Sequence, residues 1–229
     1  MYLNNAIIEV TRKCNMACCH CLRGNAQNKE ISKETLSKFL LNNDIRYIST
    51  VTFTGGEPSL NCQAINDFID ICSKHAIEVG NFYIATNGKQ VTESFISTCL
   101  RLFLFCSENE VSQIEISRSD YHIDQNEEAI KKLKCLRFVS ERPYLSYKNL
   151  IDEGKAKSLN QLNGIKGQKK KIYPLTIEDN IIDGEIYLNC KGDICSSCDL
   201  SYRRQDKNKL GNVYNKSLME MINSKEVTM

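Results

Sequence analysis

Residues 11–21 read TRKCNMACCHC, and they place Cys14, Cys18 and Cys21 on one short stretch directly after a run of apolar residues. Three and then two residues separate these cysteines, so a single loop can present all three thiolates to one four-iron four-sulfur cluster. Each thiolate would bind a different iron, and the fourth iron would stay open for a chelating ligand with an amino and a carboxylate group. The spacing therefore predicts an iron-sulfur site.

The same loop permits a second interpretation. A structural zinc ion needs four ligands, and Cys19 or His20 could supply the fourth. Metal analysis separates the two interpretations, because iron with sulfide and zinc alone are opposite results.

The composition narrows the class of protein. A chain of 229 residues with 41% hydrophobic content can bury one sizeable core, with room for a small extension. Its formal net charge is +2 and both signs are mixed along the chain, apart from a short run of lysines at 169–171, so a nucleic-acid-binding surface is not expected. We expect no membrane association and a cytoplasmic location, because no apolar stretch has the length of a membrane span and residues 1–10 lack the pattern of a secretion signal.

Twelve cysteines in a reducing compartment are expected to bind metal where they cluster and to pack as small hydrophobic side chains where they do not. The clusters lie at 14–21 and 190–198. The scattered cysteines, for which we expect burial, are Cys62, Cys72, Cys99, Cys106 and Cys135.

Apolar runs of strand length alternate with segments of helical period up to about residue 145, which is typical of βα units wound into a parallel sheet or barrel. Ser32 is the expected N-cap of the first helix. The expected strands are residues 6–10, 48–53, 82–85, 113–116 and 136–139, and the expected helices are residues 33–41, 64–75, 92–105 and 126–134.

The period of two within the strands separates an apolar face from a polar one. A packed barrel interior favours branched apolar residues, so a polar face turned inward predicts space for a polar ligand. The alternative is an open sheet with one solvated face. The residues expected on the polar face are Glu9, Thr11, Thr52, Thr54, Glu115 and Ser117.

A second segment follows the alternating region. Residues 152–171 are polar and indicate a boundary or a lid, which divides the chain into a core at 1–150 and an extension at 151–229. Strands at 177–182 and 185–188 flank Asp183-Gly184, a dipeptide that predicts a two-residue hairpin turn. Three cysteines of the extension then follow, and a last helix is expected at 218–222.

The cysteine loop, with His20 before the last cysteine, resembles the signature loop of radical S-adenosylmethionine (SAM) enzymes, and it follows the first strand as in that family. Residues 54–58, TGGEP, end the second strand and resemble the glycine-rich motif that binds the SAM amino group in the family. Two glycines let the backbone approach a ligand closely, and a carboxylate accepts hydrogen bonds from an ammonium group. The residues that this match implies are Gly55, Gly56, Glu57 and Pro58.

Two further strand ends resemble family segments that lie beside SAM. Asn87, in residues 85–88, is a candidate contact, although Asn-Gly is also an ordinary turn. Ser117 is the best candidate at the fourth strand, where Ser119 stands in place of a frequent Asp, and Arg118 and Asp120 are weaker candidates.

His122 is expected at the open rim, where functional groups of βα barrels collect. It is a candidate catalytic residue, as a proton donor or substrate contact, or else a capping histidine. The extension at residues 151–229 is called the tail below. Its cysteines Cys190, Cys195 and Cys198 loosely resemble those of the SPASM and twitch extensions of the family, which implies a possible second iron-sulfur cluster or another metal site. A fourth ligand is not identifiable, and reduced structural thiols are the alternative.

The resemblance implies an α/β fold, a partial (β/α) TIM-like barrel of the radical SAM type with a small cysteine-containing C-terminal extension. It implies an oxidoreductase in which a [4Fe-4S] cluster, reduced by a donor such as flavodoxin or ferredoxin, cleaves SAM to a 5′-deoxyadenosyl radical. Three substrate classes stay open: a ribosomal peptide, a small molecule or nucleotide, or a glycyl-radical enzyme that this protein activates. A non-catalytic zinc-binding protein is the alternative outside the family.

Overall fold

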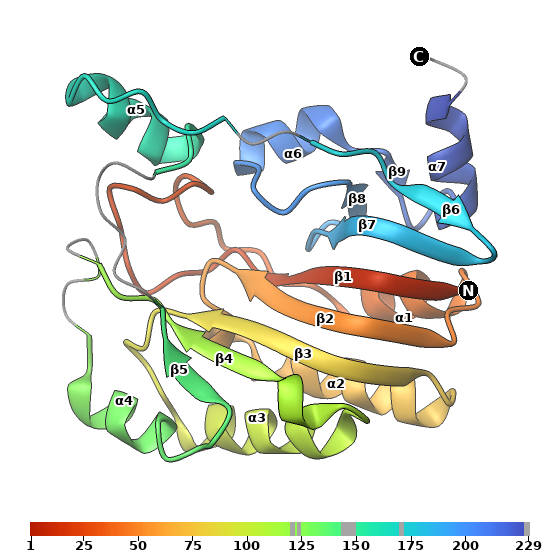
Figure 1. The fold of residues 1–229 in the computed structure, drawn as a ribbon, viewed down its shortest axis with the longest axis horizontal. Coiled ribbons are helices and arrows are strands. Elements are labelled where there is room, and N and C mark those ends of the chain that lie inside the picture. Colours follow the sequence, from red (N-terminus) through yellow and green to blue (C-terminus); the bar gives the residue numbers. More distant parts are fainter. Residues whose placement is uncertain (120–121, 123–124, 143–149, 170–171, 227–229) are drawn as a thin grey trace.

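The computed structural model describes residues 1–119, 122, 125–142, 150–169 and 172–226; Asp120, Lys170 and Lys171 lie outside this part of the chain. Within it the backbone forms one sheet in the order β5-β4-β3-β2-β1-β7-β8-β9, with β6 paired to β7. Figure 1 shows α1, α2 and α3 along one face of the sheet, and α5 and α6 above the opposite face. The sheet is not closed, so the fold is the predicted α/β class with an open, partial barrel.

The first five strands are parallel, and each expected strand is present. The fifth begins later than predicted, at Val139 rather than Leu136. Its expected first residues instead form turns, in which the amides of Cys135, Leu136 and Val139 donate to carbonyls three residues earlier. The strands are β1 (Tyr2–Thr11), β2 (Tyr47–Gly55), β3 (Glu78–Thr86), β4 (Gln113–Ile116) and β5 (Val139–Glu141).

The connecting helices begin at side-chain caps. Ser32, Asn61, Thr92 and Asn126 each accept a hydrogen bond from the amide three residues further on, which satisfies a donor that the first helical turn leaves open. The helices are α1 (Lys33–Leu41), α2 (Cys62–Lys74), α3 (Glu93–Phe105) and α4 (Glu127–Leu133), with short 3₁₀ turns η1 (Pro58–Leu60) and η2 (Asn109–Val111). The four predicted helices are confirmed to within two residues at each end.

The apolar face of the strands packs against these helices in one large core, as the period of two predicts. Cys72, Cys99 and Cys106 contribute to this core, whereas Cys62 is half-buried. Cys135 is exposed, contrary to the expectation of burial, because it lies in the turn after α4. The strand residues in the core include Ile8, Val10, Val51, Phe53, Ile114 and Ile116.

The last third of the chain extends the same sheet. Its strand β7 pairs in parallel with β1, on the edge that β2 leaves open, and β8 and β9 add antiparallel pairs beyond it. The predicted boundary region contains a helix, α5, and the last helix continues beyond the predicted end at 222. The elements are α5 (Gly154–Leu162), β6 (Thr176–Glu178), β7 (Ile181–Leu188), β8 (Asp193–Cys195), α6 (Tyr202–Asn208), β9 (Gly211–Asn212) and α7 (Leu218–Glu226).

The predicted hairpin around Asp183-Gly184 is wrong, because residues 181–188 form one strand, and a different hairpin joins β6 to β7. The turn residues are Asp179 and Asn180, with φ of 48° and 64°, the left-handed conformation that a tight two-residue turn needs at both positions. Asn and Asp tolerate this conformation better than most residues. Gly184 instead lies inside β7, at φ 106°, where the pairing with β1 changes register.

Candidate cluster and cofactor site

The cysteine loop leaves β1 and returns to it at a fixed point. The Arg12 amide donates to the Lys29 carbonyl over 2.8 Å, and the Gln27 amide donates to the Arg12 carbonyl over 2.9 Å. The Thr11 hydroxyl also donates to the Lys29 carbonyl, over 3.0 Å. The chain between Arg12 and Lys29 is therefore a closed loop, and it carries Cys19 and the three predicted ligands Cys14, Cys18 and Cys21.

Cys14, Cys18 and Cys21 are half-buried on this loop, and the Cys21 amide donates to the Cys18 carbonyl over 3.3 Å. Burial, together with the proximity of the Cys14 and Cys21 thiols, raises the pKa of Cys18 to about 11. Because thiolates are the metal-binding form, cluster assembly here would displace protons from these thiols.

The donor set can hold the predicted cluster. Among the described residues, no three His, Cys, Asp or Glu side chains converge to hold one metal ion. In a cubane cluster the three thiolate sulfurs do not have to meet at one metal ion, because each thiolate binds a different iron. The fit therefore rests on three neighbouring thiols of one loop, Cys14, Cys18 and Cys21.

Gly55 and Gly56 bring the end of β2 against the cysteine loop. The Gly56 amide donates to the Thr11 carbonyl over 2.8 Å, and the Glu57 amide to the Lys13 carbonyl over 2.9 Å. A Cβ on Gly55 would lie 2.0 Å from the Thr11 carbonyl oxygen, and one on Gly56 would lie 2.2 Å from the Lys13 carbonyl oxygen. The absence of side chains at these two glycines thus allows the backbone of the cysteine loop to pack closely against the end of β2.

The Glu57 carboxylate holds β2 to β3. It accepts hydrogen bonds from the Thr86 hydroxyl over 2.7 Å, the Asn87 amide over 2.8 Å and the Ser59 amide over 3.1 Å. Burial raises its pKa above the ordinary value, and the hydrogen bonds only partly oppose that change. Pro58, also buried, starts the η1 turn that follows. Both carboxylate oxygens of Glu57 already have donors within the protein.

Asn87 connects the end of β3 to the cysteine loop. Its Nδ2 donates to Asn15 Oδ1 over 2.9 Å and lies 3.8 Å from the Cys14 sulfur. Gln125, which the sequence reasoning missed, donates from Nε2 to the carbonyls of Asn87 and Ser117 over 2.7 and 2.9 Å. The predicted SAM-side residues at the ends of β3 and β4 are therefore joined to each other and to the cluster loop.

His122 faces the same loop. Its Nδ1 lies 2.7 Å from the Ser119 hydroxyl, and its ring meets the His20 ring edge to face, with centroids 5.1 Å apart. Burial lowers the pKa of His122, and burial together with His122 lowers that of His20 to about 4. By contrast Arg118 is directed to Glu127 in an ion pair of 2.6 Å.

The polar face of the sheet has two different environments. Glu115 accepts hydrogen bonds from Tyr83 over 2.5 Å and from Arg142 over 2.7 Å, and it remains partly exposed. Glu9 and Thr11 are fully buried, because the tail covers β1 on this face. A polar ligand on this face could therefore not contact Glu9 or Thr11 of β1.

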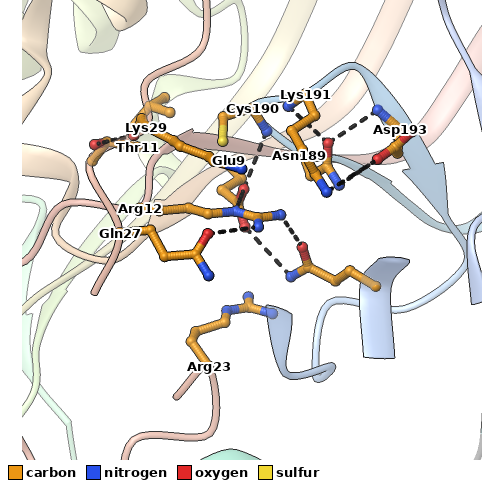
Figure 2. Close-up of polar contacts among 12 residues, drawn as sticks. Glu9, Thr11, Arg12, Arg23, Gln27, Lys29, Asn189, Cys190, Lys191 and Asp193 are labelled. Carbon is orange, nitrogen blue, oxygen red and sulfur yellow. Dashed lines mark hydrogen bonds and ion pairs between the residues drawn. The ribbon is translucent and has the colours of Figure 1, made fainter. Parts of the chain in front are cut away.

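Glu9 and Arg12 form a buried ion pair of 2.7 Å where β1 enters the loop, and Figure 2 shows this pair beside Gln27 and Cys190. Nothing in the spacing of the motif indicates the pair. The only sequence signal is a charged residue on either side of a strand end.

The tail cysteines do not share one environment. Cys190 belongs to the large core and donates its amide to Glu9 over 3.1 Å. Cys195 is buried in a small separate cluster with Ile7, Tyr187 and Leu200, against which Cys198 packs. Cys190 thus packs in a different hydrophobic cluster from Cys195 and Cys198.

A cleft of about 700 Å³ opens where the cysteine loop, the start of α5 and the start of α6 meet. Arg23 on its wall is buried and donates to the Leu200 carbonyl over 2.9 Å, while Lys157 and Arg203 are exposed. The Lys155 amide donates to the Cys21 carbonyl over 2.9 Å, so α5 begins directly on the cysteine loop. The cleft is therefore adjacent to the predicted cluster site.

Comparisons with known proteins agree with this geometry. Residues 7–111 match a family described as a 4Fe-4S single cluster domain. The uncharacterized protein MJ0907 of Methanocaldococcus jannaschii is 33% identical over 95 residues, which is 40% of this chain and 32% of that protein. The match thus spans about a third of the relative's own length.

Two solved structures share the fold over 96% of this chain. One is anSMEcpe with bound AdoMet, with a TM-score of 0.52 and 16% identity over 80% of that chain. The other is Streptococcus suis SuiB bound to the precursor peptide SuiA, with a TM-score of 0.50 and 13% identity over 64% of that chain. At these identities the two likenesses concern the fold.

The chain therefore contains, at residues 7–111, a region similar to 4Fe-4S single cluster domains, and it shares its fold with these two solved structures. Among the described residues no helix combines the length and the apolar content needed to cross a bilayer.

Proposed function

We propose that this protein is an iron-sulfur enzyme that cleaves SAM reductively and uses the resulting radical to abstract hydrogen from a substrate. The observation that carries the proposal is that three thiols of one loop lie against the ends of β2 and β3, through Gly56 and Asn87. When bound, a [4Fe-4S] cluster with SAM on its open iron would supply the electron transfer and the radical.

The chain's own residues orient and enclose these groups. Cys14, Cys18 and Cys21 would hold the cluster, and Asn87 fixes the loop beside Cys14 through Asn15. The rings of His20, on the cysteine loop, and of His122 meet edge to face, and burial lowers the pKa of both.

The test is anaerobic reconstitution with iron and sulfide, followed by measurement of 5′-deoxyadenosine formed from SAM with a chemical reductant. Replacing Cys14, Cys18 or Cys21 with Ala is expected to abolish the product. Cys19→Ala is the matched control, because Cys19 lies on the same loop, is exposed and is not one of the three spaced ligands. Normal product from the triple variant, or zinc without iron in the wild type, would contradict the proposal.

We further infer a peptide substrate and a flavodoxin or ferredoxin as electron donor, in the cytoplasm. Two observations support the peptide. Solved relatives of this fold carry peptides, anSMEcpe with the Cp18Cys peptide at a TM-score of 0.50 and SuiB with SuiA. The cleft beside the cysteine loop is also open and presents Lys157 and Arg203 on its walls.

A comparison of additives tests the substrate class. A mixed-sequence peptide pool is expected to accelerate 5′-deoxyadenosine formation, and a nucleoside and nucleotide pool is expected to leave it unchanged. The charge reversal Arg203→Glu should reduce the peptide effect while the slow cleavage without substrate persists. Acceleration by the nucleotide pool alone would overturn the peptide assignment and leave the SAM chemistry intact.

A further inference from the structure

A buried polar cluster joins the start of the cysteine loop to the tail. Glu9 and Gln205 are 0% exposed and Arg12 is 1% exposed, although Gln205 lies 193 residues along the chain from Arg12. Buried polar side chains of this kind persist when their hydrogen-bonding groups are satisfied. The contacts of these three residues therefore show what the cluster holds in place.

All three guanidinium nitrogens of Arg12 donate, each to a different segment. Nε donates to Glu9 on β1 over 2.7 Å, Nη1 to Gln27 at the far end of the loop over 3.1 Å, and Nη2 to Gln205 on α6 over 2.7 Å. The face of the guanidinium lies 4.3 Å from the centre of the Tyr202 ring. Because the fork is planar and rigid, these bonds fix both the position and the plane of the side chain.

Glu9 receives donors from the start of the cysteine loop, from β7 and from the chain that follows β7. Besides Arg12, these are the Tyr187 hydroxyl over 2.6 Å and the Cys190 amide over 3.1 Å. Burial raises the pKa of Glu9, but the charges of Arg12 and Arg23 and the Tyr187 hydrogen bond outweigh burial, so the net pKa is lowered. Glu9 is therefore a fixed anion to which the loop and the tail both attach.

Gln205 completes the attachment from the tail side. Its Oε1 accepts from Arg12, and its Nε2 donates to Tyr187 over 3.2 Å and to the Leu200 carbonyl over 3.3 Å. The Arg12 backbone in turn holds both ends of the loop, through the Gln27 amide and the Lys29 carbonyl. One side chain of α6 thus reaches the residue at which the cysteine loop opens and closes.

We propose that Gln205 is a positioning residue for the cysteine loop. Acting through Arg12 and Glu9, it fixes the loop in the conformation that receives the cluster. The tail thereby completes the cluster site without contributing a metal ligand to it. The part of this proposal that concerns the cluster rests on the proposed function, and the part that concerns the loop does not.

A matched control exists in the tail itself. Asn189 is also 0% exposed, and within the described part of the chain its side chain bonds only to tail groups, the Lys191 and Asp193 amides and the Asp193 carboxylate. Figure 2 shows this second group of contacts around Asn189 and Asp193, separate from the Arg12 contacts. Gln205→Met and Asn189→Leu both remove a buried amide of the tail, but only the first removes a bond to the loop.

The first measurement uses the protein without a cluster. Amide hydrogen exchange followed by NMR should show about tenfold or faster exchange of the Arg12 and Gln27 amides in Gln205→Met, and wild-type exchange of the same amides in Asn189→Leu. Equal acceleration in both variants would reduce Gln205 to a general stabiliser of the tail. No acceleration in either would show that the loop holds itself, and each result would overturn the proposal.

The second measurement uses the reconstituted protein. Gln205→Met should bind iron and sulfide but give a broadened or shifted electron paramagnetic resonance spectrum of the reduced cluster, and Asn189→Leu should give the wild-type spectrum. A wild-type spectrum from Gln205→Met would contradict the proposal. A wild-type protein that binds no cluster would contradict the proposed function alone, because the exchange result would stand.

A third measurement needs no variant and covers the case in which Gln205→Met does not fold. In wild-type protein under increasing denaturant, the loop amides of Arg12 and Gln27 should open together with the Gln205 amide, as one cooperative unit. If the loop amides open at a lower denaturant concentration than the α6 amide, Gln205 does not hold the loop and the proposal is overturned.

Discussion

Two buried glutamates stand at the ends of neighbouring strands, and their surroundings differ. Glu9, near the end of β1, pairs with the cation Arg12 and with donors from the tail. Glu57, just after β2, has only uncharged donors, and these come from its own turn and from the end of β3. The pKa is lowered at Glu9 and raised at Glu57. The end of β1 is thus stabilised by an ion pair and by residues of the tail. The end of β2 is stabilised by uncharged hydrogen-bond donors from its own turn and from the end of β3.

The largest effect is expected from Glu9→Gln. It leaves Arg12 buried without its anion, and removing one partner of a buried ion pair costs about 3–5 kcal/mol. The free energy of unfolding from urea titration measures the loss. Glu178→Gln, at an exposed position of β6, is the control and should change stability by less than about 0.5 kcal/mol. Similar small losses in both variants would show that the ion pair contributes little.

A smaller loss is expected from Glu57→Gln. The amide keeps the size of the carboxylate but turns an NH₂ group toward an N–H or O–H donor, which leaves buried donors unsatisfied at a cost of about 2–3 kcal/mol. Urea titration under the same conditions gives the comparison. A loss larger than that of Glu9→Gln would reverse the proposed order of the two strand ends.

Gly56→Ala tests the contact between the two strand ends. Its Cβ would lie 2.2 Å from the Lys13 carbonyl oxygen, so the cysteine loop must shift, at an expected cost of about 1–2 kcal/mol. Iron binding and SAM binding should weaken together, measured by metal analysis and by calorimetry. Gly164→Ala is the control: its φ of 64° strains an alanine, but a Cβ there meets nothing within 4 Å, so stability should fall while iron and SAM binding stay at wild type. An unchanged cluster with weakened SAM binding would mean that Gly56 faces only the ligand.

The pH dependence is the smallest effect and differs in sign between the two sites. Glu9, with a lowered pKa, stabilises the fold above its unfolded pKa of 4.5, and this contribution is lost as the pH falls. Glu57, with a raised pKa, contributes stability that is present below 4.5 and is lost as the pH rises through its folded value.

Unfolding free energies measured between about pH 3 and 7 should therefore show the advantage of wild type over Glu9→Gln shrinking in acid. The advantage over Glu57→Gln should grow in acid. Each slope is limited to about 1.4 kcal/mol per pH unit, the value for one proton. If the wild-type advantage over Glu9→Gln and the advantage over Glu57→Gln changed with pH in the same direction, the proposed difference between the two glutamates would be wrong.

Local signals were sufficient to predict the βα half of the fold. Ser32, Thr92 and Asn126 cap the helices that follow them, and the alternation in β4 gives its bounds. These features depend on neighbours within a few residues, which is why a single sequence reveals them. The cysteine loop could be located for the same reason, since its spacing is local.

The remaining features depend on long-range contacts. The partner of β1 on its second edge, β7, and the role of Gln205 follow from contacts between residues far apart in the chain, which no local pattern encodes. The hairpin turn was misplaced because Asp183-Gly184 is a strong turn signal, yet β7 uses its glycine for a change of register and Asp179-Asn180 makes the turn. The donors to the Glu57 carboxylate from the end of β3 also come from distant residues, and its contact with SAM stays a prediction.

The parallel pairing of β1 with β7 has a consequence for biosynthesis. The Glu9 carboxylate emerges from the ribosome 178 residues before the Tyr187 hydroxyl that bonds to it. During that interval β1 has one uncovered edge, and the cysteine loop lacks its attachment to α6. Iron delivered to the nascent chain would meet exposed thiols in a loop of undefined shape. Delivery after β7 and α6 have docked would meet the finished site, so the order of synthesis favours late maturation of the cluster.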